Sequence, residues 1–343
     1  METILVLTHA DDSGASLTKP SLEAVTAGLS LAAQLQAPLT IGIVAVDPAT
    51  AANTLASTGV RLIAVSGEAF AQPRYATDAA ACEALCRAAN ATMVLVPGSS
   101  RFARVAAGVA HRLNGFIDTH ITGINAAAEN IEVTRWFYRQ RIEVVLSRDS
   151  RPWFVLLDAG THAPFIGEAA AAIAEQIAVQ PPTIRTTVAG LRAPQQGAQT
   201  IRPDARLLFV AGAGWTKKQP DGQTHVPEAG DLILGLLRAT SASLGSSKSL
   251  VDQGGEGHSV LPFLTHLNQI GQTGATPRHP KGLSTCCHGE EPHVVGWRFI
   301  AERRTISLDP NCGWARGKAD VVYVADAFQV IAKLNALLEA AKP

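Results

Sequence analysis

The residues best suited to metal chemistry are three cysteines and two histidines near the C-terminus: Cys286, Cys287, His288, His293 and Cys312. Thiolate and imidazole groups bind zinc and iron. The spacing is unfavourable, because neighbouring cysteines rarely chelate one tetrahedral ion and no CxxC pair is present. Cys286 and Cys287 are therefore predicted to be packed residues at the end of a strand. A metal site and a reactive thiol are the alternatives.

A second motif precedes these residues and consists of Gly271, Gln272, Thr273 and Gly274. Glycines let a backbone approach a bound cofactor closely, and the glutamine and threonine between them can hydrogen-bond to it. A plain turn can have the same composition, so the motif alone is a weak signal. Residues 271–293 therefore form either a cofactor loop or part of a metal site, and the rest of the chain has to distinguish the two.

The composition limits the class of protein. A chain of 343 residues is long enough for two domains of ordinary size. Its 29 basic residues are balanced by 29 acidic ones, so no overall charge attracts it to nucleic acid or to an anionic membrane. An aromatic content of 5%, with many small apolar residues, favours helices packed on a sheet. The composition predicts an α/β protein that does not bind nucleic acid.

The first residues and the cysteine count indicate the compartment. An apolar strand pattern begins at about Ile4, with no basic segment, apolar signal core or cleavage site before it. No other run reaches the roughly 18 apolar residues of a membrane helix. Five cysteines, an odd number, predict free thiols, and Cys82 and Cys86 are expected to be small buried residues of a helix. We therefore expect a soluble, cytoplasmic protein that does not span a membrane.

Residues 1–180 alternate short apolar runs with helical patterns, which predicts an N-terminal α/β domain. The strands are expected at 3–9, 39–46, 60–67 and 92–100, with antiparallel strands at one sheet edge at 131–147 and 152–160. The helices are expected at 21–37, capped by Ser21; at 77–91, capped by Thr77 or Asp78; at 101–115, closed by Gly115; and at 166–179. No GxGxxG motif or Walker A loop follows a strand here. This domain is therefore predicted to be a scaffold or docking domain.

A stretch rich in Pro, Gln, Gly and Thr at 181–200 is predicted to be a linker. The second domain, 201–343, begins with a strand at 205–214 and a helix at 229–245. Strand patterns follow at 293–301, 305–308 and 320–326, and a helix at 327–341 ends the chain. This order predicts a doubly wound, flavodoxin-like parallel sheet with its ligand at the carboxyl ends of the strands.

Four landmarks of the second domain give a family resemblance. They are the glycine-rich turn VAGAGW at 210–215, GSSKSLVD at 245–252, QIGQTG at 269–274 and YVADAFQVI at 323–331. In this order they resemble the α subunit of electron transfer flavoproteins, and SLEAVTAGLSLA at 21–32 resembles the family's opening helix. The resemblance implies an FAD-binding electron carrier, rather than a catalyst of substrate turnover. It also implies a heterodimer with a β subunit that completes the flavin pocket and often carries AMP, a flavin-dependent dehydrogenase as electron donor, and a membrane quinone oxidoreductase as acceptor.

The resemblance also implies the cofactor-binding residues, which are Ser247, Lys248, Gly271, Gln272, Thr273, Gly274, His288, Gly289, His293 and Asp326. Gln272 and Thr273 would hydrogen-bond the flavin ring edge. A protonated His293 would favour the negative charge that gathers near N1 and C2=O when one electron is added. Lys248 occupies the position at which the family has a basic residue next to the flavin ring. A lysine there retains the positive charge but cannot stack on the ring as a planar arginine does. Asp326 would lie near the adenosine end.

Several residues depart from the family pattern. Ala213 replaces an arginine between two glycines that serves the phosphates, His288 stands where the family has serine, and Glu290 and Glu291 bring carboxylates near the flavin. The family's asparagine falls at about Leu308. The alternative functions are therefore a non-redox structural subunit that has lost FAD, and a metal or thiol protein using Cys286, Cys287 and His288. The basic, aromatic run RWFYRQR at 135–141 is predicted to belong to a subunit interface.

Overall fold

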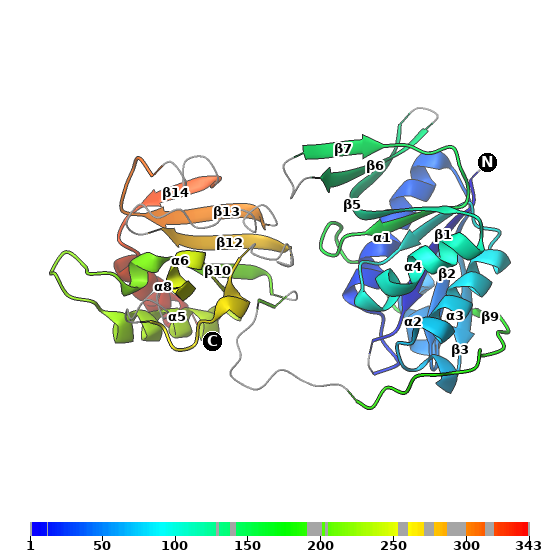
Figure 1. The fold of residues 1–343 in the computed structure, drawn as a ribbon, viewed down its shortest axis with the longest axis horizontal. Coiled ribbons are helices and arrows are strands. Elements are labelled where there is room, and N and C mark those ends of the chain that lie inside the picture. Colours follow the sequence, from blue (N-terminus) through cyan, green and yellow to red (C-terminus); the bar gives the residue numbers. More distant parts are fainter. Residues whose placement is uncertain are drawn as a thin grey trace. The chain divides into compact units, whose positions relative to one another are not determined.

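The structure, a computed structural model, describes residues 2–11, 13–127, 130–137, 142–190, 201–202, 205–252, 260–270, 278–286, 300–312 and 319–341. The chain divides into two compact units, which we call unit 1 (Met1–Leu191) and unit 2 (Arg192–Pro343). Each unit has its own sheet (Figure 1). In the described part of the chain, no helix is both long and apolar enough to cross a bilayer.

Unit 1 is built on a nine-stranded sheet in the order β7-β6-β5-β8-β4-β1-β2-β3-β9. The strands are β1 (Ile4–His9), β2 (Leu39–Ala45), β3 (Arg61–Ser66), β4 (Met93–Val96), β5 (Phe116–Ala127), β6 (Asn130–Phe137), β7 (Ile142–Leu146), β8 (Trp153–Leu157) and β9 (Glu175–Gln176). All neighbours pair in parallel except β5 with β6 and β6 with β7. The direction of winding reverses between β1 and β4, which makes their carboxyl ends a topological switch point.

Helices cover both faces of this sheet. They are α1 (Lys19–Leu35), α2 (Ala49–Leu55), α3 (Tyr75–Ala88) and α4 (Ser100–Arg112), with 3-10 turns η1 (Ala56–Thr58) and η2 (Glu68–Phe70). Leu31 of α1 and Leu55 of α2 pack on one face, and Leu85 of α3 and Val109 of α4 pack on the other. The strands between these two layers are apolar on both sides, as buried parallel strands are.

The helix predicted at 166–179 is wrong. This segment runs in an extended conformation, with Phe165 N–H donating to Leu22 O and Ala170 N–H donating to Asn53 O. It ends as β9, which adds to the edge of β3 by pairing Glu175 with Ile63. Its alanines favour a helix locally, but the contacts with α1, α2 and β3 decide the conformation.

Four further expectations for unit 1 are corrected. Strand β8 is not at an edge but lies in parallel between β5 and β4. Helix α1 is capped by Thr18, because the Ser21 hydroxyl is buried beside β1 and donates to His9 O. Helix α3 begins earlier, at Tyr75, because Asp78 is buried in an ion pair instead of capping. At the end of α4 the positive φ of 53° belongs to Asn114 rather than to glycine.

Unit 2 contains a five-stranded, fully parallel sheet in the order β11-β10-β12-β13-β14. The strands are β10 (Leu207–Ala211), β11 (Ser243–Ser246), β12 (His279–Cys286), β13 (Ile300–Ser307) and β14 (Val321–Val324). Numbered from β10, this is the order 2-1-3-4-5 of flavodoxin-like sheets. The predicted fold class, two α/β parts with a flavodoxin-like parallel sheet in the second, is confirmed.

In its described residues, the helical elements of unit 2 are η3 (Ala213–Thr216), α5 (Val226–Thr240), α6 (Lys248–Asp252), η5 (His266–Asn268) and α8 (Ala327–Ala340). Helices α5 and α8 pack together on one face of the sheet, with Ile233, Leu236 and Ile331 in the core beneath them (Figure 1). The helix predicted at 229–245 is shorter at its C-terminus, because Ser241 adopts a left-handed conformation with φ of 52° and residues 243–246 form β11.

Candidate functional site

The carboxyl edge of the unit 2 sheet carries three of the ten cofactor residues that the sequence predicted. The sheet's switch point lies between β10 and β12, where parallel strands of this order bind ligands. The turn 212–216 follows β10, Ser247 and Lys248 follow β11, and Asp326 comes two residues after β14. The described residues therefore bring Ser247, Lys248 and Asp326 to one edge of one sheet.

A hydroxyl at the end of β12 holds the turn after β10 in place. Thr285 Oγ1 accepts hydrogen bonds from Trp215 Nε1 at 2.6 Å and from Gly212 N at 3.4 Å, and it donates to Val210 O at 3.1 Å. Thr285 and Trp215 are each 1% exposed. One buried hydroxyl thus joins β10, β12 and η3 across the switch point. This role was not predicted, because Thr285 lies within residues 271–293, which were interpreted as a cofactor loop or part of a metal site.

Ser247 and Lys248 are already engaged in local contacts. Ser247 N–H donates to Ala211 O at 2.9 Å, and its Oγ accepts from Leu250 N at 3.2 Å, so it begins helix α6. The ammonium of Lys248 is 2.5 Å from Asp252 Oδ2, and its side chain is 42% exposed. Lys248 therefore reaches the solvent-facing side of this edge with its charge balanced by Asp252.

Within the part of the chain that the structure describes, two buried polar atoms beside Ser247 have no hydrogen-bond partner. They are Ser246 Oγ, on a residue that is 0% exposed, and Gln269 Oε1, on a residue that is 6% exposed. The two residues form a parallel β-bridge, with Ile270 N–H donating to Ser246 O at 3.1 Å. Buried polar groups in folded proteins are nearly always paired, so an orphaned pair at a strand end requires an explanation.

The other predicted cofactor residues lie outside the described residues. These are Gly271, Gln272, Thr273, Gly274, His288, Gly289 and His293. The chain enters these two segments from Ile270, bonded to the end of β11, and from Cys286, the last residue of β12. Both entry points lie at the carboxyl edge of the sheet.

A cavity of about 290 Å³ opens next to Asp326. It is lined by Gln219, Pro220, Asp221, His225, Glu228, Asp326, Phe328 and Gln329. His225 Nε2 is 2.7 Å from Asp221 Oδ2, and its Nδ1 is 3.3 Å from Glu228 Oε2. Asp326 caps α8 by accepting from Gln329 N at 3.1 Å. The carboxylates disfavour a phosphate and suit sugar hydroxyls or an amino group.

The histidine of this cavity should titrate above its ordinary range. The hydrogen bond and charge of Asp221 raise the pKa of His225. The folded state thus favours the protonated ring, and its stabilising contribution is complete below the ordinary pKa and is lost as the pH rises through the raised one. We expect an NMR titration to show this, and Asp221→Asn to bring the pKa of His225 back down. His162, whose pKa burial lowers, is the internal comparison, and equal midpoints for both rings would contradict the prediction.

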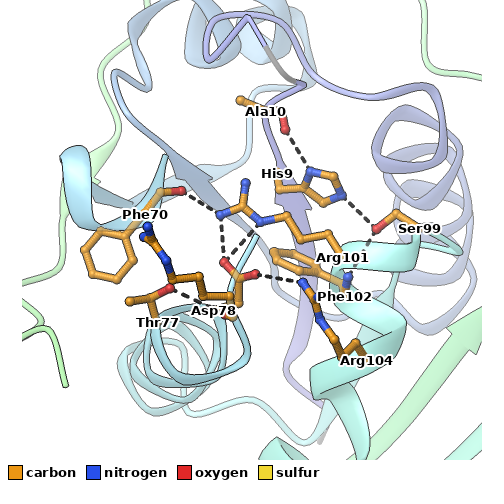
Figure 2. A network of polar contacts seen from close by, with 10 residues as sticks. His9, Ala10, Phe70, Thr77, Asp78, Ser99, Arg101, Phe102 and Arg104 are labelled. Carbon is orange, nitrogen blue, oxygen red and sulfur yellow. Dashed lines mark hydrogen bonds and ion pairs between the residues drawn. The ribbon is translucent and has the colours of Figure 1, made fainter. Parts of the chain in front are cut away.

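Unit 1 has a polar network at its own switch point (Figure 2), in which one buried oxygen, Asp78 Oδ2, has no hydrogen-bond partner among the described residues. His9 Nδ1 lies 2.8 Å from Ala10 O, and its Nε2 lies 2.7 Å from Ser99 Oγ. Arg101 donates to Asp78 Oδ1 from Nε at 3.0 Å and from Nη2 at 2.7 Å. Burial is the largest influence on Asp78 and raises the pKa of its carboxyl. These contacts tie α3 and α4 to the end of β1, as a scaffold requires.

The metal interpretation gains no support from the described residues, which contain no group of three or more metal-binding side chains. Cys312 is buried in the small apolar cluster with Leu208 and Val210. Cys287, His288 and His293 lie outside the described residues. Cys82 and Cys86 are buried in α3, as predicted, and burial raises the pKa of both thiols.

Comparison with known proteins gives one match. A family model described as the electron transfer flavoprotein domain matches residues 6–184, which is more than half of the chain and covers the described strands of the unit 1 sheet. No curated protein matches the sequence. The family assignment therefore comes from unit 1, whereas the sequence landmarks of a flavin site lie in unit 2.

Proposed function

The chain belongs to the electron transfer flavoprotein family, and on that premise we propose that it is the α subunit, which binds FAD in unit 2. It would carry electrons from a flavin-dependent dehydrogenase to a membrane quinone oxidoreductase. Its partner would be a β subunit that completes the flavin pocket and can hold AMP. The domain boundaries would be 1–180, a linker at 181–200 and 201–343.

One observation carries the proposal: the three sequence landmarks that the structure describes in full lie at the carboxyl edge of a 2-1-3-4-5 sheet. Sheets of this order bind flavin at their switch point. The turn 212–216, Ser247 and Asp326 come from three different strands of this sheet. All segments that follow the strands of a parallel sheet reach its carboxyl edge, so the support comes from the resemblance having selected residues in three of these segments.

The described residues fit a flavin cofactor in charge and in hydrogen-bonding capacity. Lys248 supplies a cation that can lie against the ring, and the cavity at Asp326 suits the adenosine end. Ser246 Oγ and Gln269 Oε1 supply hydrogen-bonding atoms that have no partner among the described residues. Bound FAD would supply the redox chemistry, accepting and passing on electrons singly or in pairs. The protein's part would be to bind it, orient it and set the charge around the ring.

A second candidate, a structural subunit without FAD, rests on Ala213. This residue is 1% exposed within η3, where the family has an arginine for the phosphates. An alanine leaves phosphate binding to the backbone N–H groups of the turn and to Lys217 or Lys218, which follow it. FAD affinity should accordingly be lower than with an arginine present, because each charge-assisted hydrogen bond contributes about 1.5–3 kcal/mol.

Unit 1 is proposed to dock the partners. On its antiparallel edge, Arg135 lies 4.3 Å from the centroid of the Phe137 ring, and Ile142 and Val145 of the edge strand β7 are 49% and 55% exposed. An edge strand with exposed apolar side chains is a common place for another chain to bind. The predicted interface at 135–141 belongs to this edge, with 138–141 outside the described residues.

Asp252→Asn tests the electrostatic role of Lys248. The substitution removes the carboxylate that neutralises the ammonium. We expect the first one-electron potential of bound flavin to rise by about 30–60 mV, since 59 mV corresponds to a factor of ten for one electron. Potentiometric titration measures it. Asp221→Asn, which removes a carboxylate not paired with Lys248, should leave the potential within about 10 mV. A rise of the same size in both variants would contradict the role of Lys248.

The proposed function is tested by the visible spectrum and metal content of the protein, purified alone and together with a β-type partner. Flavin absorption in stoichiometric amount would establish a working electron carrier. A colourless, metal-free complex would favour the structural subunit. A stoichiometric metal that is lost when Cys286 and Cys287 are both changed to serine would support the metal-binding alternative instead.

A further inference from the structure

We propose that Ser246 and Gln269 bind the ribityl chain of the flavin, a contact that rests on the proposed function. Neither residue was among the cofactor residues expected from the sequence. Backbone pairing positions the two side chains, and their polar atoms lack hydrogen-bond partners among the described residues. One part of a flavin has the chemistry to supply those partners.

The backbone brings the two side chains to the same face of the sheet edge. Ser246 and Gln269 are partners in a parallel bridge, and residues paired in this way point to the same side. Their neighbours Gly245 and Ile270 occupy the opposite side, where a Cβ on Gly245 would lie 2.7 Å from Ile270 Cδ1. Glycine at 245 thus lets Ile270 pack closely and fixes the register of the bridge.

Both side chains are buried and lack partners. Gln269 Oε1 can only accept, so it needs a donor, whereas Ser246 Oγ can donate and accept. Leaving such a group unsatisfied costs about 1–3 kcal/mol. The neighbouring strand residue Ser243 shows the contrast, because its Oγ accepts from Arg202 N at 2.7 Å. Within β11 the unpaired hydroxyl is thus at the last position, the end that meets the proposed cofactor, and Gln269 is its bridge partner.

The chemistry of the pair selects the sugar-alcohol part of the cofactor. A phosphate at neutral pH has no donor to offer Gln269 Oε1, and neither side chain is charged. The family resemblance already assigns the edge of the flavin ring to Gln272 and Thr273. The ribityl hydroxyls both donate and accept, which is what a hydroxyl beside an amide oxygen requires.

Ser246→Ala and Gln269→Met, alone and together, test the inference in the full-length protein, with its partner where that is needed for binding. We expect each change to weaken riboflavin and FAD binding about fivefold, and the double variant about 20-fold, as for the loss of one and two neutral hydrogen bonds. Lumiflavin, which lacks the ribityl chain, should bind equally to all variants. The cofactor-free Ser246→Ala protein should unfold at the same or a higher urea concentration, because an orphaned group has been removed.

Ser243→Ala is the matched control, since it removes a partnered hydroxyl from the same strand. It should lower the unfolding midpoint and leave riboflavin affinity unchanged. The inference is overturned if Ser246→Ala leaves riboflavin affinity unchanged, as it would if a buried water satisfied the pair, or if lumiflavin weakens equally. These results leave the proposed function intact provided that the wild-type protein binds flavin. A wild type that binds neither riboflavin nor FAD overturns both.

Discussion

Replacing Arg101 with methionine is expected to destabilise unit 1 by about 3–5 kcal/mol. The guanidinium is held by Asp78 Oδ1 and by Phe70 O, the latter at 2.6 Å from Nη2. The side chains of Arg101 and Asp78 are 8% and 0% exposed. Methionine fills much of the same space but leaves the Asp78 carboxylate buried without its main partner. Arg104, at 3.9 Å from the other oxygen and 46% exposed, compensates weakly. Urea unfolding followed by hydrogen exchange of the β1 amides measures the change.

Two further variants separate the buried charge from the shape of the side chain. Asp78→Leu combined with Arg101→Met removes both charges, so we expect its stability to return to within about 1 kcal/mol of the wild type. Arg87→Met removes an exposed arginine, paired with Glu83 one turn away, and should cost less than about 0.5 kcal/mol. If Arg101→Met were no worse than Arg87→Met, the pair would not be buried in solution, and the scaffold role of the network would be wrong.

Thr285→Val is expected to have the largest effect on the proposed flavin site. Valine keeps the shape of threonine but removes the acceptor of Trp215 Nε1 and Gly212 N. Leaving the indole N–H buried and unpaired costs about 1–3 kcal/mol, and the turn 212–216 loses its anchor to β12. We therefore expect a stability loss of about 2–3 kcal/mol and FAD binding weaker by at least about tenfold. Urea unfolding and flavin fluorescence titration measure the two quantities.

Thr305→Val provides the comparison within the same sheet. Thr305 is a buried residue of β13 that shares one hydrogen bond, 2.8 Å long, with Ser284. Its loss should cost about 1 kcal/mol and leave FAD affinity unchanged, because it holds no part of the switch point. Thr285→Ser retains the hydroxyl and should bind FAD nearly as the wild type does. Equal loss of affinity in Thr285→Val and Thr305→Val would indicate that stability alone, and not the position of the turn, controls binding.

These predictions assign different tasks to the two units. In unit 1, Arg101 and Asp78 are buried and paired with each other, so the polar network joins α4 to α3, although Asp78 Oδ2 has no hydrogen-bond partner among the described residues. In unit 2, the carboxyl edge has one satisfied network at Thr285 and one unsatisfied pair at Ser246 and Gln269. A site that binds a cofactor needs residues that position the backbone, and it needs residues whose hydrogen-bonding atoms are left for the ligand.

The sequence by itself determined the α/β class, the parallel sheet of unit 2 and the order of the landmarks near its carboxyl edge. Apolar periodicity and glycine-rich turns are local signals, so they can be recognised from the sequence alone. Ser247, Lys248 and Asp326 were selected by their place in the landmarks that resemble the family, and not by periodicity. Caps were less predictable, because Ser21 and Asp78 have side chains that suit a cap locally but are recruited by β1 and Arg101.

Only the tertiary structure decided how distant segments pair. Residues 166–179 have the composition of a helix, yet they become an extended segment because α1, α2 and β3 offer partners to their backbone. Thr285 and Trp215 are 70 residues apart and meet only through the sheet order. Whether the side chains of Ser246 and Gln269 find hydrogen-bond partners likewise depends on the residues that surround them in the fold. Long-range pairing of this kind cannot be predicted from local sequence, because the contacts that stabilise it exist only after folding.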